Sequence, residues 1–501
     1  MHRRYAPTCP WLAGAATLLS AATLASLFGG PPWVTTLVVA AWAGVAMVAI
    51  MRRLDCDAWV VTLVLAGMAL YVLYLGYTAP EQRNYDARGQ HQYLLYIAAH
   101  AALPPPGYCN VCYHPPLYYV LAALWARCLL VTHWLPLPKG LPLLSLIFAW
   151  VFVLFGILTV RRLTRRRSVV YLATALLVFW PYSVINSIRV HNDSLASALM
   201  AAAIYFAVKW YQVGRGRDLW WATLFAALGL LTKGTALVVV AALVVVVALR
   251  WWRTRSARAW APWALLAGAV LGVAFGLGPY RHSDRGDPSL CRTFFGDACL
   301  VDQSLFAGNR AANYFGFDVQ TFLSEPYLAS MRGTERNYFL PSLLKSSLFG
   351  TYNTDPERDL AYPLNNGLAK FLNALLLGMV ALGLTALGLA TRARLRRYTP
   401  VLAIGVTMVA GLAVFRLVIP SPHHNDLRHV FPLLILASLL YAEAVEEWRR
   451  RLPWVGMGAR LVAVLFLVTS TLYFVPKAGV LCRSVAKATA ERLLGGAYRC
   501  R

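Results

Sequence analysis

Long apolar runs, separated by short polar segments, follow one another along almost the whole chain. Most of these runs approach the roughly 20 residues that an α-helix needs to cross a bilayer. The pattern predicts an all-α polytopic membrane protein with about 13 transmembrane helices. The expected spans are residues 11–28, 33–51, 58–78, 141–160, 169–187, 194–210, 219–232, 235–250, 260–279, 367–390, 399–418, 430–445 and 457–475.

Two longer connections, residues 79–140 and 280–365, interrupt this series of spans. Within the first, the apolar stretch from Leu117 to Leu135 is broken by charged and polar side chains. That composition favours an amphipathic helix lying at the outer membrane surface over a further span. The second connection contains two short apolar stretches within residues 338–349, which also predict interfacial helices.

Composition supports the membrane assignment. The chain of 501 residues is 59% hydrophobic and only 14% charged. A typical soluble domain carries about 25% charged residues. This chain therefore lacks the polar side chains that would cover a globular surface, and lipid must be its solvent.

The net charge of +26 comes largely from basic clusters in the short connections between spans. The clusters lie at residues 52–53, 161–167, 209–217, 250–258, 392–397 and 449–451. Short basic loops are retained in the cytoplasm, and with a cytoplasmic N-terminus every cluster falls on that side. Because the basic residues are confined to these loops, we expect no nucleic-acid partner. The two long connections and the turns at 188–193, 232–235 and 419–429 then lie outside.

The N-terminus and the cysteines add little to this picture. The first apolar run leads through Gly29 and Pro32 straight into a second one, so we expect a retained helix instead of a cleaved signal peptide. The nine cysteines lack the spacing of a disulfide framework. A local bridge, such as one between Cys291 and Cys299, is compatible with the sequence.

The first polar motif follows the third span. Asp86 is a candidate general base, because a carboxylate at the outer mouth of the bundle can take the proton of an acceptor hydroxyl. Its neighbours Tyr85, Arg88, His91 and Tyr93 are candidates for the lining of the same substrate pocket. Alternatively, Asp86 only caps a helix in an ordinary loop. The residues alone leave both interpretations open.

The second motif centres on His114, which precedes Pro115 and Pro116. A proline pair fixes a helix start and aims His114 above the membrane, although a plain loop-to-helix transition explains it equally well. Cys109 and Cys112 stand at a spacing that invites a zinc site with His114. A second pair of ligands is missing, so a local disulfide or free thiols are favoured.

The third motif lies in the short outer turn between the fifth and sixth spans. It contains Arg189, His191, Asn192 and Asp193. Insertion into a membrane does not require such a set, and ionisable residues beside a bilayer mark function by default. Asn192 or Asp193 can also cap the next helix, and the two roles can coexist.

Two further motifs place cations on the same side. Lys233 divides a long apolar stretch into two short halves, and it either snorkels to the interface or neutralises a buried anion. Arg428 and His429 open the twelfth span, and the arginine fork suits bidentate recognition of phosphate. The alternative for Arg428 is an interfacial anchor.

All five motifs fall on the predicted outer side. A carboxylate beside several cations suits the attack of a hydroxyl group on the anomeric carbon of a lipid-linked sugar. In that reaction Asp86 removes the proton, and Lys233, Arg428 and His114 stabilise the departing lipid phosphate. Positioning and charge neutralisation dominate reactions with phosphate leaving groups.

At these residues the chain resembles the GT-C superfamily of polytopic membrane glycosyltransferases. It is similar to dolichyl-phosphate-mannose–protein mannosyltransferases, to aminoarabinose transferases and to RgtA/B/C/D-like transferases. The resemblance covers residues 85 to 432. It is carried by Tyr-Asp-x-x-x-x-His-x-x-Tyr from Tyr85, Pro-Pro-Leu-Tyr-Tyr from Pro115, Asn-Asp-Ser from Asn192, Thr-Lys-Gly from Thr232 and the late Arg428.

The resemblance implies a GT-C-like bundle that takes a sugar, such as mannose or another hexose, from undecaprenyl or dolichyl phosphate. It implies that Asp86 is the catalytic acid of the first loop and Asp193 a second acid in the outer pocket, and we expect inverting transfer. His114 stands where a lysine is common in the aminoarabinose enzymes. Its contact with the donor phosphate would therefore depend on pH.

Two departures from the family pattern concern the N-terminal region and Arg428. The first-loop acid commonly follows the first span, but here it follows the third. Residues 1–57 therefore look like a transmembrane hairpin added to a core of residues 58–475, with an outer tail at 476–501. Arg428-His429 stands where Arg-Tyr is common.

Three other functions are alternatives for the same pattern of spans and polar residues. A secondary transporter would also line a path with acids and cations, but the chain shows no inverted repeat and no charged residue in the middle of a span. A polysaccharide polymerase or ligase would use polyprenyl-linked sugars and outer Arg and His residues, and a non-catalytic scaffold is the third alternative.

For a glycosyltransferase, the acceptor is a lipid, a glycan or a protein. The sequence does not decide whether Mg²⁺ or Mn²⁺ is needed, and we expect the protein in a bacterial inner membrane.

Overall fold

The computed structural model describes residues 32–78, 86–105, 108–254, 309–328, 331, 337–351, 362–418, 420 and 422–475. Throughout these residues the regular elements are α- and 3-10 helices, and no strand occurs among them. The all-α class is therefore confirmed. Two expected spans, 11–28 and 260–279, and the tail 476–501 lie outside the described residues.

Seven helices of the described residues are long and apolar enough to cross a membrane. Each overlaps an expected span, and together they make the chain a multi-pass membrane protein. They are α3 (Ala58–Tyr77), α7 (Leu137–Leu163), α10 (Asn192–Val213), α12 (Leu237–Thr254) with the short η1 (Gly234–Ala236) before it, α18 (Tyr362–Gly388), α19 (Arg392–Val418) and α21 (Pro453–Phe474).

Further helices lie at expected spans outside that set of seven. They are α2 (Pro32–Arg53), α8 (Arg167–Phe179), α11 (Gly216–Thr232) and α20 (Leu433–Arg451). The total of 13 spans stays a prediction.

The expectation of one continuous span at residues 169–187 is wrong. The structure divides it into α8 and α9 (Pro181–Asn186), with Trp180 in an extended conformation between them (φ −62°, ψ 132°). Pro181 causes the break, because it lacks an amide hydrogen and disfavours the helical conformation of the residue before it. All six residues of α9 are buried. The break therefore places a short helix, and the turn after it, inside the bundle.

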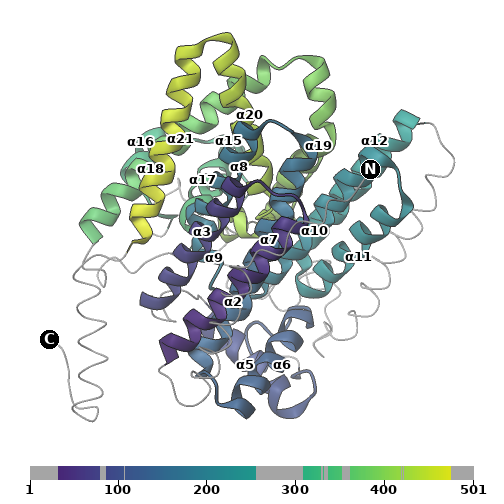
Figure 1. Ribbon diagram of the computed structural model, residues 1–501, viewed down its shortest axis with the longest axis vertical. Helices are drawn as coiled ribbons and strands as arrows, with labels where there is room; N and C mark the ends of the chain where they lie inside the picture. Colours follow the sequence, from purple (N-terminus) through teal and green to yellow (C-terminus); the bar gives the residue numbers. More distant parts are fainter. Residues whose placement is uncertain are drawn as a thin grey trace.

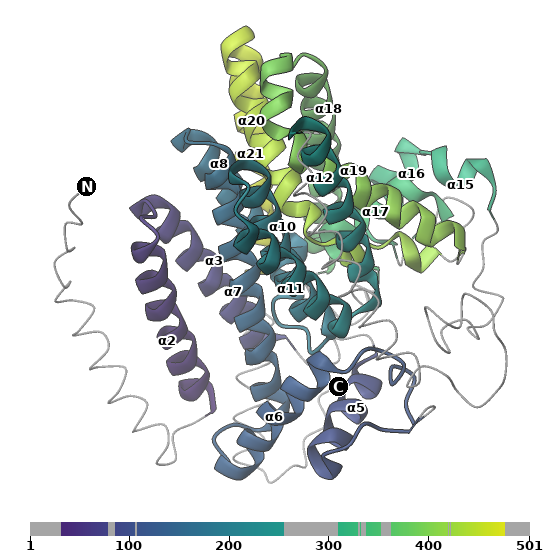
Figure 2. The ribbon, with the colours of Figure 1, turned by 90° about the vertical axis from the view of Figure 1, so that its right-hand side faces the viewer.

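The central helix of the bundle is α10, which packs against α7 and α11. Its apolar window is 78% buried, more than that of any other of the seven spans. A second group, α8, α18, α20 and α21, packs pairwise and lies together in both ribbon views (Figures 1 and 2). Between the groups, α12 packs against α19.

The basic clusters meet at one end of the bundle. Arg161 Nη1 donates to the Leu54 carbonyl at 2.7 Å, where α2 turns into α3. Arg162 binds the last turn of α10, and Arg451 Nη2 donates to the Leu389 carbonyl beyond α18 at 2.6 Å. Clusters that are far apart in the sequence thus share one face. That this face is cytoplasmic stays a prediction.

A pair of helices, α5 (Ala87–His100) and α6 (Leu117–Thr132), lies at the opposite end (Figures 1 and 2). The rings of Tyr93 and Tyr119 stack between the two helices with centroids 3.8 Å apart. Trp125 Nε1 donates to the Gly140 carbonyl at 2.8 Å and ties α6 to α7. With 16 residues, α6 is too short to cross a bilayer. Its place at the membrane surface stays a prediction.

The second long connection contributes α15 (Ala311–Phe315), α16 (Val319–Ser324) and α17 (Phe339–Phe349). The helix α17 is mostly buried within the protein and packs against α9 and α18. That it lies at the membrane interface stays a prediction. Its polar side chains find partners inside the protein. Lys345 Nζ donates to the Phe322 carbonyl at 2.6 Å, and Ser346 Oγ accepts from the Leu427 amide at 2.9 Å. Because these groups are hydrogen-bonded, they can be buried inside the protein.

Candidate active site

The turn between α9 and α10 builds the buried centre of the site. His191 has an extended backbone (φ −152°, ψ 147°) and caps α10. Asp193 follows in the first turn, where the helix dipole favours a negative charge. Asn192 Nδ2 donates to the Thr232 carbonyl at 3.3 Å, which holds the end of α11 against the start of α10. The turn therefore caps a helix and gathers polar groups at the same time.

Lys233 and Asp193 form a buried ion pair, in which Lys233 Nζ donates to Asp193 Oδ1. The two residues are only 5% and 3% exposed. A charge at such a position is stable only with a partner of opposite sign. The buried anion beside Lys233 is therefore the Asp193 carboxylate, and this lysine does not snorkel to a surface.

The imidazole of His191 adds a second group to this pair. Its Nδ1 lies 3.2 Å from the Asp193 amide nitrogen and 3.0 Å from Asp193 Oδ2. An unprotonated Nδ1 accepts from the amide, whereas a protonated one donates to the carboxylate. Either form of the imidazole therefore binds Asp193.

A second carboxylate, Asp426, lies between η8 (Pro422–Asn425) and η9 (Leu427–Val430). It accepts from the Arg428 amide at 3.0 Å and from the Thr351 hydroxyl, and the Arg428 Nε lies 3.6 Å from Asp426 Oδ2. Burial raises the pKa of Asp426 above its ordinary value, and the bonds from Arg428 and Thr351 oppose that shift. The loop before α20 is thereby fixed to the end of α17.

Arg189 completes the cluster from the α9 side. Its Nη1 donates to the Tyr182 hydroxyl at 3.1 Å, and its guanidinium lies 5.4 Å from the centroid of the same ring. Gly350 follows α17 at φ 73° beside both residues, and a Cβ there would lie 2.9 Å from Tyr182 Cε2. The positive φ and the close approach both favour glycine at this position.

The cluster joins three cations, Arg189, Lys233 and Arg428, to two carboxylates, Asp193 and Asp426. Burial lowers the pKa of Arg428 to about 10, so the guanidinium stays charged at neutral pH. The residues come from segments far apart in the chain, and η9 contacts both η1 and α10. Buried cations in excess of carboxylates make a suitable site for an added anion.

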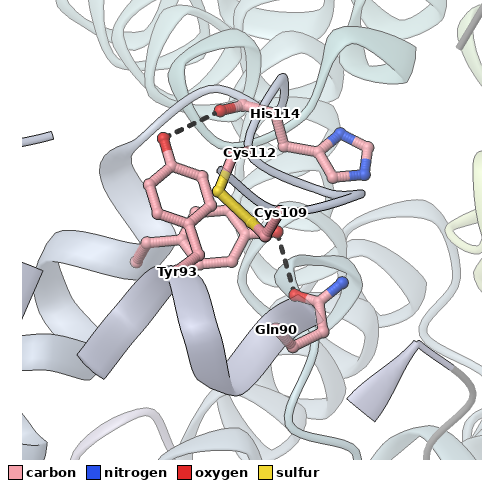
Figure 3. Close-up of a disulfide and its surroundings, with 6 residues drawn as sticks. Gln90, Tyr93, Cys109, Cys112 and His114 are labelled. Carbon is pink, nitrogen blue, oxygen red and sulfur yellow. Dashed lines mark hydrogen bonds between the residues drawn. A yellow bond between two sulfur atoms is a disulfide. The ribbon is translucent and has the colours of Figure 1, made fainter. Parts of the chain in front are cut away.

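The loop between α5 and α6 carries a disulfide between Cys109 and Cys112 (Figure 3). Both thiols are consumed, so neither is available as a zinc ligand. Tyr93 Oη donates to the His114 carbonyl at 3.2 Å (Figure 3), which fixes the backbone beside Tyr113. Across the described residues, no group of three His, Cys, Asp or Glu side chains could hold a metal ion.

Asp86 lies outside the buried cluster. It is exposed at the start of α5 with a left-handed backbone (φ 55°, ψ 17°), which aspartate tolerates better than most residues. Within the described residues its side chain makes no capping bond to α5, and Asn110 Nδ2 lies 3.5 Å from Asp86 Oδ1. A capping role therefore does not explain Asp86.

Tyr113 links Asp86 to the buried cluster. Burial raises the pKa of Tyr113, and the negative charges of Asp86 and Asp193 both add to this shift. Tyr113 thus lies within electrostatic range of the exposed carboxylate and of the buried one. The loop closed by the disulfide stands between the two parts of the site.

The site candidates that the structure describes fall into two groups. The buried cluster contains seven of them: Arg189, His191, Asn192, Asp193, Lys233, Arg428 and His429. The α5–α6 pair and its loop carry Asp86, Arg88, His91, Tyr93 and His114. Three candidates, Tyr85, Cys291 and Cys299, lie outside the described residues.

Four residues of the site were not among the sequence candidates: Tyr113, Tyr182, Thr351 and Asp426. Asp426 stands two residues before Arg428, and that spacing of acid and cation was an available signal. Tyr182 and Thr351 join the site only because Pro181 breaks a helix and Gly350 turns the chain. No sequence motif marks such contacts.

The central part of the chain is similar to a known protein family. Residues 139–275 match the family model of dolichyl-phosphate-mannose-protein mannosyltransferase. This stretch of the chain resembles those mannosyltransferases. It includes Arg189, Asp193 and Lys233 of the buried cluster, and the expected resemblance is confirmed over these residues.

Two crystal structures of ArnT from Cupriavidus metallidurans are similar to the chain at low sequence identity. The apo structure has a TM-score of 0.36 and 13% identity, covering 88% of this chain and 80% of that chain. The structure bound to undecaprenyl phosphate has a TM-score of 0.38 and 15% identity, covering 88% and 81%. No curated protein sequence matches the chain.

Proposed function

We propose that the protein is a membrane glycosyltransferase that moves a sugar from undecaprenyl or dolichyl phosphate to an acceptor hydroxyl on the extracytoplasmic face. The observation that carries the proposal is the buried cluster of Arg189, Lys233 and Arg428 around two carboxylates. It lies at the end of the bundle opposite the arginine clusters. The family-model match over residues 139–275 supports the same function.

An apolar groove gives the lipid part of such a donor a place to lie. The groove has a volume of about 710 Å³ and is lined chiefly by α18, α19 and α20. Its lining includes Tyr398 near the basic end and Leu343 and Leu427 near the charge cluster. Leu427 is the residue between Asp426 and Arg428. A phosphate beside Arg428 would therefore have its isoprenoid chain beside an apolar surface.

The proposed chemistry is a single displacement. The acceptor oxygen attacks the anomeric carbon, the bond from this carbon to the phosphate oxygen breaks, and the electron pair leaves with the phosphate. Lys233, Arg428 and His114 neutralise the charge that develops on that oxygen. Attack from the side opposite the phosphate inverts the anomeric configuration.

The two aspartates are suited to different tasks. Asp86 is exposed, so an acceptor can reach it, and we assign it the role of general base. Asp193 is buried against Lys233 and His191. Its carboxylate holds these two side chains in place and contributes to catalysis through them.

The substitution Asp86→Asn tests the proposed base. General base catalysis typically contributes 10²–10⁴-fold, so we expect turnover to fall by at least about 100-fold. The assay uses the full-length protein in proteoliposomes and a panel of undecaprenyl- and dolichyl-phosphate hexoses. The readout is release of polyprenyl phosphate, together with mass spectrometry of cell-surface glycans with and without the gene.

Asp318→Asn is the matched control, because Asp318 is another carboxylate of the outer connections, is half-buried and caps α16. It should retain full turnover. Full turnover of Asp86→Asn would refute the base assignment. Movement of a solute across liposomes without any sugar donor would favour a transporter instead.

A further inference from the structure

His429 is a buried imidazole beside the charge cluster whose hydrogen-bonding capacity is unused. It lies in η9 and is 6% exposed. Among the described residues, neither Nδ1 nor Nε2 has a hydrogen-bond partner. Leaving two buried polar atoms unsatisfied is costly. Such a side chain is prepared to bond a ligand that the cluster admits.

The surroundings of His429 are apolar on one side and cationic on the other. Its ring meets Phe415 of α19 edge-on, with centroids 5.4 Å apart, and the ring of His424 in η8 lies 6.2 Å away. The charges that act on it are those of Lys233, Arg428 and His424, with Asp193 opposing them.

The other helices packed against η9 and its neighbours direct their cations elsewhere. Lys345 of α17 donates to the carbonyls of Phe322 and Glu325. Arg416 of α19 exerts its charge on Tyr314. The cations that bear on His429 are therefore those of the proposed phosphate site.

In this environment the imidazole is neutral at physiological pH. Burial lowers the pKa of His429 well below its ordinary value, and the positive charges of Lys233 and Arg428 lower it further. An anion bound among Lys233, Arg428 and His429 would reverse that effect, because a negative charge beside an imidazole favours its protonated form.

The proposed reaction changes the charge of the bound phosphate. The sugar donor is a phosphodiester with one negative charge. When the sugar leaves, the lipid phosphate is a monoester, whose second pKa is about 6, so at neutral pH it carries close to two negative charges. The binding site must therefore accommodate one more negative charge after transfer than before it.

We propose that His429 binds the phosphate of the lipid monoester and takes up a proton from solvent as it does so. This inference rests on the proposed function. His429 would thereby stabilise the product charge and distinguish the monoester from the sugar diester. It acts beside Lys233 and Arg428, and it is the member of this set that we expect to change its charge when the phosphate binds.

Binding of farnesyl phosphate, a short prenyl monoester, tests the proposal on the full-length protein in detergent. Affinity is measured by titration calorimetry at about pH 8 and about pH 6. Relative to His429→Gln, the wild type should gain up to about 100-fold in affinity as the pH falls over this range, since uptake of one proton on binding changes the affinity tenfold per pH unit. His100→Gln, an exposed histidine of α5, should behave like the wild type.

A second measurement needs no variant. At about pH 8 the monoester is already a dianion, so protons taken up on binding belong to the protein. Calorimetry in buffers of different ionisation enthalpy should show uptake with farnesyl phosphate and none with its methyl diester. If His429→Gln shows the same pH dependence and the same uptake as the wild type, the inference is wrong while the phosphate site stands. If the wild type does not bind farnesyl phosphate at all, the proposed donor class is wrong as well.

Discussion

At the scale of single residues, the site is governed by the cost of burying charge. Lys233 and Asp193 lie inside the bundle as a pair, and neither charge would be stable there alone. Each therefore has a structural role that is separate from any contact with substrate. A single substitution changes both the stability of the protein and the contact with substrate. Replacing both residues restores the stability and so tests the contact with substrate alone.

Asp193→Asn should destabilise the protein by about 3–5 kcal/mol, because it leaves the Lys233 charge buried without its partner. The double variant Asp193→Leu, Lys233→Met replaces the pair with apolar side chains of similar size and should regain most of that stability. Denaturant unfolding in detergent measures both effects. The double variant should still lack transfer activity, since the cation for the leaving phosphate is gone. Transfer at the wild-type rate would show that Lys233 is structural only.

At the scale of elements, the second long connection is anchored through its polar side chains. Lys345 is 1% exposed and donates from α17 to two carbonyls at the end of α16. Its ammonium group also lies 4.4 Å from the centroid of the Phe322 ring. Ser346, the next residue, accepts from the Leu427 amide. One helix turn thus holds the outer connection on one side and the loop of Asp426 on the other.

Lys345 should make the stability of this connection depend on pH. Burial lowers its pKa to about 7 from 10.5. Between these values the unfolded chain holds a proton that the folded one does not, so the contribution of Lys345 to stability rises with pH and is lost as the pH falls toward 7. The free energy of unfolding of the wild type relative to Lys345→Met should therefore increase from about pH 7 to about pH 9, by no more than about 1.4 kcal/mol per pH unit. Lys139→Met, at an exposed lysine, should show no such trend. If the difference in the free energy of unfolding between the wild type and Lys345→Met does not change with pH, the assignment is wrong.

At the scale of the whole molecule, the bundle is polarised. Arginines tie the helix ends together at one end, and the charge cluster lies at the other. The apolar groove along α18, α19 and α20 runs between these ends. A lipid-borne substrate could therefore reach the cluster from within the membrane, while a polar acceptor would approach through the loop of Asp86.

Blocking the groove should impair transfer from donors with a long prenyl chain more than transfer from donors with a short one. Ala410 lines the groove on α19, and Ala410→Trp should raise the KM for a full-length polyprenyl donor. The reason is that the indole fills part of the groove and removes van der Waals contacts that the isoprenoid chain would make there. A donor with a short prenyl chain should be affected little. Val414→Trp, on the exposed face of the same helix, should leave both donors unchanged, and an equal loss for both donors in Ala410→Trp would argue against the groove.

The sequence anticipated the membrane architecture well, because length and apolarity of each run are local properties. The seven long apolar helices overlap expected spans, and the clusters around Arg161 and Arg451 meet at one end. Prediction failed at residues 169–187, where Pro181 breaks the apolar run locally. The burial of α17 was not anticipated, because Lys345 and Ser346 find their partners in other segments.

The candidate site, too, could be predicted from the sequence only in part. By itself the sequence determined which ionisable residues stand at the polar end of the spans, Asp86, Asp193, Lys233 and Arg428 among them, since charges are excluded from the interior of a bilayer. Only the tertiary structure decided that Lys233 neutralises Asp193, that Asp426 and Tyr182 join the cluster, and that Asp86 remains exposed. Pairing and burial depend on which helix ends meet in space, and no local pattern of residues specifies that.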